Sequence, residues 1–176
     1  FYTIVRTFRA CSLPSDQALA VVEDLALYAG AKGMVGGQAA DVIGEQGITD
    51  LAQLEYIHLR KTSDLIVFSL RAGARIAGAT DVQLEALTRF GSLIGLAFQI
   101  QDDLLDVIGD ERKLGKKVNS DEKLAKVTYP YFLGVEASRA KVRELTEQAQ
   151  AVVTGGAVPE PARLLQIAEF LMRRDH

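Results

Sequence analysis

The chain has 176 residues, 48% of them hydrophobic and 24% charged, which is typical of one globular domain. Its formal net charge of −3 argues against nucleic acid as a partner, and no apolar run approaches the roughly 18 residues of a membrane span, so stable membrane insertion is not expected. The single cysteine, Cys11, cannot form an internal disulfide and is compatible with a reducing cytoplasm.

Helical spacing starts at the first residue. Phe1 to Ala10 has the pattern of a helix already under way, so we expect further sequence upstream of it. Ser15, after a proline, opens a second predicted helix that runs to about Gly30. From Gly33 to about Ile43 the residues are small and almost uncharged, which predicts a buried helix that another helix can approach closely. Gly44 to Thr49 is then a turn.

Two long helices are predicted next. The first begins at Thr49 and Asp50 and reaches about Ala77; the second opens with the capping-box pattern Thr80-Asp81-Val82-Gln83 and reaches Val107. The segment from Gly109 to Lys126 has no strong periodicity, a length more typical of a functional segment than of a passive connector. Further helices are predicted near 131–153 and 161–173. The sequence therefore predicts a single all-α domain over residues 1–176.

The second long helix ends in a group of carboxylates, within Phe98-Gln99-Ile100-Gln101-Asp102-Asp103-Leu104-Leu105-Asp106. Positions i, i+1 and i+4 are expected to share one helical face. Three such charges repel one another by about 1 kcal/mol per pair in water, so divalent cations are favoured there. The bland alternative is a solvated helix end, and an EF-hand calcium loop is poorly supported because Val107 and Ile108 occupy positions that need polar ligands.

Five motifs in chain order carry a family resemblance. They are Gly36-Gly37-Gln38 with Asp41, Lys61-Thr62, Phe98-Gln99 before the aspartates, Leu114-Gly115-Lys116, and Lys126-Val127-Thr128-Tyr129-Pro130. Together they resemble the C-terminal part of the trans-prenyl diphosphate synthase family, and within it the bacterial farnesyl and geranylgeranyl diphosphate synthases. The resemblance implies an isoprenoid-synthase-type helical bundle around a central cavity, and a homodimer.

The resemblance also implies roles for individual residues. Three aspartates would hold Mg²⁺, with the first as the best candidate for a direct ligand: Asp102, Asp103 and Asp106. Three lysines would bind the diphosphate of the allylic substrate: Lys61, Lys116 and Lys126. Lys61, Thr62 and Gln99 would be catalytic residues, the last two near the reacting carbons. Gln38, Asp41 and Phe98 would support the cavity.

The implied reaction joins an allylic diphosphate to isopentenyl diphosphate, and it needs charge stabilisation rather than a protein nucleophile. The family's first aspartate-rich motif is absent from Phe1 to Gly33. We therefore expect the chain to be the C-terminal portion of a longer synthase and to be inactive alone. Two alternatives stay open: a non-catalytic helical subunit that regulates a full-length synthase, and a terpene cyclase of the same fold.

Overall fold

The computed structural model describes residues 2–10, 13–44, 47–48, 50–114 and 127–173. Within these ranges the chain is helical and has no strand, as the sequence predicts. None of the described helices combines the length and the apolar character that crossing a membrane requires. In chain order the elements are α1 Tyr2–Ala10, α2 Ser15–Ala29, α3 Met34–Gly44, α4 Leu51–His58, the π-helical turn η1 Leu59–Ser63, α5 Asp64–Ile76, α6 Asp81–Leu114, α7 Tyr129–Leu133, α8 Val135–Thr154 and α9 Ala162–Met172.

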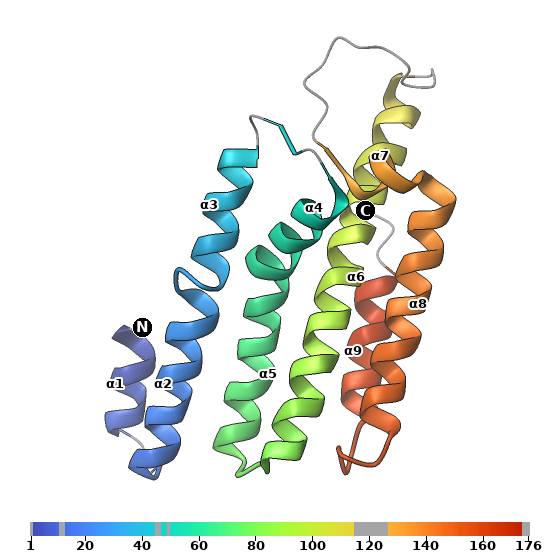
Figure 1. Ribbon diagram of the computed structural model, residues 1–176. Coiled ribbons are helices and arrows are strands. Elements are labelled where there is room, and N and C mark those ends of the chain that lie inside the picture. Colours follow the sequence, from blue (N-terminus) through green and yellow to red (C-terminus); the bar gives the residue numbers. More distant parts are fainter. Residues whose placement is uncertain (1, 11–12, 45–46, 49, 115–126, 174–176) are drawn as a thin grey trace.

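Four helices lie side by side in an up-and-down array, in the order α2, α5, α6 and α8 (Figure 1). The longest helix, α6, packs against α5 on one side and α8 on the other, while α9 packs against α6 and α8. In the upper part of the view in Figure 1, α3 and α4 lie next to η1, and α7 contacts α4, α6 and α8. Whether these helices line a central cavity stays a prediction.

The core follows the faces of α6. One buried cluster joins α6 to α4, α7 and α8, and a second joins it to α8 and α9. Because other helices cover α6 on several sides, rotating it would pull its apolar residues out of the core and leave a cavity. The packing of α6 therefore also fixes the position of the polar residues near its end. The first cluster comprises Leu54, Leu96, Ala97, Ile100, Leu104, Tyr129, Val142 and Leu145; the second comprises Phe90, Ile94, Ala149, Val153 and Ala168.

The predicted starts of the two long helical segments are confirmed by their caps. The side chain of Asp50 accepts a hydrogen bond from the Gln53 amide at 2.9 Å. Thr80 and Gln83 form the reciprocal capping box, with bonds of 2.8 and 3.4 Å. The prediction was wrong at the end of α6, which continues past Val107, because one glycine costs a helix only about 1 kcal/mol.

Two further expectations were wrong. The helix at 33–43 is not buried: Ile43 is 69% exposed and Val35 and Val42 are also exposed, while Gly37 faces a neighbour. Small residues permit close approach on one face only, which does not require the other face to be covered. The single helix predicted at 131–153 is two helices, α7 and α8, because Gly134 between them has φ +81°, a conformation that favours glycine.

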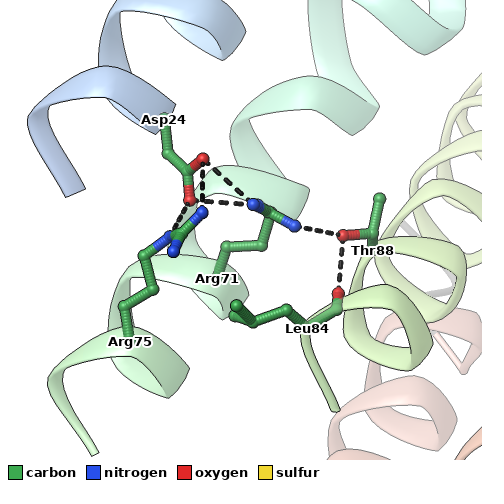
Figure 2. Close-up of polar contacts among 5 residues, drawn as sticks. All are labelled: Asp24, Arg71, Arg75, Leu84 and Thr88. Atoms are coloured by element: carbon green, nitrogen blue, oxygen red, sulfur yellow. Dashed lines mark hydrogen bonds and ion pairs between the residues drawn. The ribbon is translucent and has the colours of Figure 1, made fainter. Parts of the chain in front are cut away.

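A buried carboxylate ties α2, α5 and α6 together (Figure 2). Asp24 is 5% exposed and accepts hydrogen bonds from Arg71 and Arg75 at 2.6 to 3.3 Å, and Arg71 also donates to the Thr88 hydroxyl at 3.0 Å. Burial raises the pKa of Asp24, but the hydrogen bonds and charges of the two guanidinium groups outweigh it, so the pKa lies below its ordinary value. Asp24 is thus ionised and forms ion pairs that connect α2 to α5, and through Arg71 to α6.

Candidate active site

The helical path from α4 to α5 passes through one π-helical turn. The Asp64 amide donates to the carbonyl of Leu59, five residues earlier, where an α-helix would use Arg60. Lys61 and Thr62 lie in this turn. The sequence predicted an uninterrupted helix here, so the π turn is a feature that it did not reveal. Such turns occur frequently at functional sites.

Lys61 extends from η1 toward α3. Its Nζ donates to Asp41 Oδ2 at 2.6 Å, which brings together two residues that the resemblance placed in one site. The Lys61 side chain is 40% exposed. An ion pair this accessible contributes only about 0 to 1 kcal/mol, so the ammonium can turn to a stronger anion at little cost. Gln38, on the same helix, is exposed.

Thr62 extends from η1 to the other side and contacts α6. Its hydroxyl donates to Gln99 Oε1 at 2.8 Å. Gln99 precedes Asp102 by three residues on α6, so the two side chains lie on neighbouring positions of one face. Phe98, which directly precedes Gln99 in the chain, is half-buried. The structure therefore joins the Lys-Thr motif to the aspartate-rich end of α6.

Asp103 points into the protein. It is 1% exposed, its Oδ2 accepts a hydrogen bond from the Tyr129 amide at 2.9 Å, and the same oxygen lies 3.0 Å from His58 Nε2. The expectation that all three aspartates share one face is wrong for Asp103, because adjacent helical residues point about 100° apart. This carboxylate links α6 to α4 and to the start of α7. Metal binding by Asp103 stays a prediction.

The same network continues through Tyr129. Its hydroxyl donates to Glu55 Oε1 at 2.5 Å, and Glu55 lies one turn before His58 on α4. Burial first, and the Glu55 carboxylate second, raise the pKa of Tyr129 above its ordinary value, so the phenol stays a hydrogen-bond donor to Glu55 even in alkaline solution. His58, Glu55 and this role of Tyr129 were not predicted from the sequence. The i, i+3 spacing of Glu55 and His58, which places both on one side of a mostly apolar helix, was the available clue.

Asp102 and Asp106 lie one turn apart on α6, the first half-buried and the second exposed. Within the described ranges, no group of three or more histidine, cysteine, aspartate and glutamate side chains is arranged to hold a metal ion. Two carboxylates nevertheless fit Mg²⁺, which keeps several waters and is usually shared between one or two carboxylates and the phosphates of a ligand. The donor set suits an ion that arrives with a phosphate ligand. Lys116 and Lys126 lie outside the described residues.

The chain is similar to known proteins over most of its length. The model of the polyprenyl synthetase family matches residues 2–155. The chain belongs to this family. It is 43% identical over 164 residues to the farnesyl diphosphate synthase of Geobacillus stearothermophilus, an alignment that covers 93% of this chain and 55% of the relative.

Solved structures show the same helical fold for this polyprenyl synthetase chain. An FPP/GFPP synthase from Zymomonas mobilis superposes with a TM-score of 0.76 at 31% identity, covering 90% of this chain and 52% of that one. A geranyltransferase from Helicobacter pylori, complexed with magnesium and isoprenyl diphosphate, gives 0.73 at 30% identity, covering 96% and 55%. The chain thus spans about half the length of the relatives it matches.

Proposed function

We propose that the natural protein containing this chain is a prenyltransferase that joins an allylic diphosphate to isopentenyl diphosphate and releases inorganic diphosphate. The observation that carries the proposal is the convergence on η1. From this turn the accessible ammonium of Lys61 reaches Asp41 of α3, and the hydroxyl of Thr62 is held by the Gln99 amide of α6. Asp102 and Asp106 follow Gln99 on α6, about one and two turns later.

These groups match the chemistry of the reaction. The allylic C–O bond breaks, and its electron pair leaves with the diphosphate, while the double bond of isopentenyl diphosphate forms the new C–C bond and a proton is then lost. When bound, Mg²⁺ supplies positive charge that stabilises the leaving diphosphate. Lys61 binds the same diphosphate, aided by Lys116 and Lys126, which lie outside the described residues.

The remaining residues of the proposed site orient the others and exclude water. Asp41 holds the Lys61 ammonium when no diphosphate is bound. Because this ion pair is exposed and therefore weak, Lys61 can leave Asp41 and bind the diphosphate when it arrives. The Thr62–Gln99 pair lies near the reacting carbons, while Gln38 and Phe98 support the cavity. Asp102 is the proposed direct Mg²⁺ ligand, and Asp103 and Asp106 act partly through water; Asp103 also contributes by its buried hydrogen bonds.

Several finer points belong to the same proposal. The products are farnesyl or geranylgeranyl diphosphate, the protein is a cytoplasmic homodimer, and residues 1–176 alone do not catalyse the reaction. The Helicobacter pylori relative, solved with magnesium and isoprenyl diphosphate, supports the ligand classes. The alternative of a non-catalytic subunit leaves the Lys61, Thr62 and Gln99 arrangement without a use.

Product analysis tests the proposal. The natural protein is incubated with Mg²⁺, dimethylallyl diphosphate and isopentenyl diphosphate, and both prenyl products and inorganic diphosphate are quantified. We expect a longer prenyl diphosphate and one diphosphate released per bond formed. A cyclic hydrocarbon would instead indicate a terpene cyclase. No turnover until a second, full-length synthase is added would indicate a regulatory subunit, and either result contradicts the proposal.

A further inference from the structure

The π-helical turn η1 is held between two glycines of different helices. A Cβ added to Gly37 of α3 would lie 2.7 Å from the carbonyl carbon and the Cβ of Arg60, and closer still to the amide nitrogen of Lys61. A Cβ added to Gly95 of α6 would lie 2.6 Å from the Cα and Cβ of Ser63, and closer still to its Oγ. The turn is therefore in direct contact with backbone on both sides.

Four residues after each glycine, the same helix carries a side chain that accepts a hydrogen bond from a residue of η1. On α3 the pair is Gly37 and Asp41, and Asp41 accepts the hydrogen bond from Lys61. On α6 the pair is Gly95 and Gln99, and Gln99 accepts the hydrogen bond from Thr62. Residues at i and i+4 lie on one face, so each helix presents a close backbone contact and a polar acceptor to η1 together.

We propose that Gly37 and Gly95 are positioning residues that hold the π-helical turn, and with it Lys61 and Thr62, in the site. The proposal rests on the proposed function for its catalytic consequence. The contacts are mainly with backbone or with atoms next to it, so they cannot be relieved by rotating a flexible side chain. An added methyl group requires the turn to retreat by roughly 0.7 Å or more to regain ordinary van der Waals separation.

Alanine substitution at either glycine is the test, in the complete natural protein. A misplacement of about 1 Å can lower a rate about 100-fold, so Gly37→Ala and Gly95→Ala are each expected to lower kcat by about that factor. A purely structural defect would lower the melting temperature without this specific loss of kcat in the folded protein.

The chain offers two matched glycines as controls. Gly73 of α5 has open space around an added Cβ, so Gly73→Ala is expected to keep both stability and kcat. Gly91 lies one turn before Gly95 on α6, and an added Cβ there would lie 3.0 Å from Val67 and Leu70 of α5, away from η1. Gly91→Ala is therefore expected to lower the melting temperature while kcat of the folded protein stays within about twofold of wild type.

A second measurement needs no assay of activity. Scalar coupling across the hydrogen bond between the Asp64 amide and the Leu59 carbonyl, observed by NMR on labelled protein, reports the π turn directly. We expect this coupling in the wild type and in the Gly73 and Gly91 variants. In the folded Gly37→Ala and Gly95→Ala variants it should be lost or move to the carbonyl of Arg60, as in an α-helix.

The outcomes separate this proposal from the proposed function. The proposal is overturned if Gly37→Ala and Gly95→Ala both retain the Leu59 coupling and the wild-type kcat. It is also overturned if Gly91→Ala lowers kcat as much as these two variants do. Absence of the Leu59 coupling in the wild type also overturns it, and this measurement can be made even if a variant does not fold. A wild-type protein that shows the coupling but does not catalyse prenyl transfer contradicts the proposed function alone. The NMR comparison of the variants then still tests whether Gly37 and Gly95 hold the π-helical turn.

Discussion

Replacing Asp103 with alanine tests the role of this buried carboxylate most sharply. The side chain is 1% exposed, and its Oδ2 serves the Tyr129 amide at 2.9 Å and lies 3.0 Å from His58 Nε2. The variant leaves two buried polar groups without their partner, at about 1 to 3 kcal/mol each. We therefore expect the free energy of unfolding to fall by about 4 kcal/mol. For a chain of this size that corresponds to a melting temperature lower by roughly 8 to 16 °C.

Urea denaturation and thermal melting, followed by circular dichroism without Mg²⁺, measure this change. Asp106→Ala is the matched control on the same helix: Asp106 is exposed, so we expect a change of about 1 kcal/mol or less. Asp103→Asn keeps the shape and one acceptor oxygen, and should fall between the two. Equal stability of Asp103→Ala and Asp106→Ala would refute the reasoning, because it would mean that Asp103 has no structural partners.

Three further predictions concern charge, ligand binding and the extent of the chain. Asp24→Asn should destabilise the protein most at neutral pH. Because the pKa of Asp24 is lowered by folding, its contribution is present above the unfolded-state value of about 3.9 and is lost as pH falls below it, so urea titrations of the two proteins should converge in acid. Lys116→Ala should raise KM for the allylic diphosphate much more than it changes kcat, while Lys141→Ala, at a partly exposed lysine of α8 that pairs with Glu144, should change neither. The reverse pattern in steady-state kinetics would exclude Lys116 as a diphosphate ligand. Residues 1–176 expressed alone should give no condensation product from dimethylallyl and isopentenyl diphosphates, and measurable product would disprove this.

The sequence predicted the helices well where one local cause determines them. The Asp50 cap and the Thr80–Gln83 box specify their helix starts through bonds within four residues. The π turn differs, because apolar spacing continues through it and the atoms that contact it belong to Gly37 and Gly95, distant in the chain. The break at Gly134 was not predicted, because a glycine inside a helical pattern does not show whether its φ is positive.

The same distinction between local causes and contacts distant in the chain applies to the candidate site. The resemblance assigned Lys61, Asp41, Thr62 and Gln99 to one site, and the structure pairs Lys61 with Asp41 and Thr62 with Gln99, while their roles in a site stay a prediction. The direction of Asp103 was not predicted, because a run of adjacent aspartates does not say which one turns toward the core. His58 and Tyr129 determine it from other elements.

The central claim is that Asp102 helps to hold the Mg²⁺ on which departure of the diphosphate depends, and one measurement tests it directly. The natural protein and its Asp102→Ala variant are compared for prenyl transfer across a range of Mg²⁺ concentrations, with Asp16→Ala on α2 as an exposed control. We predict that Asp102→Ala lowers the rate by about 100-fold or more and weakens its dependence on Mg²⁺, while the control keeps both. Unchanged turnover and Mg²⁺ dependence in the folded Asp102→Ala protein would contradict the claim.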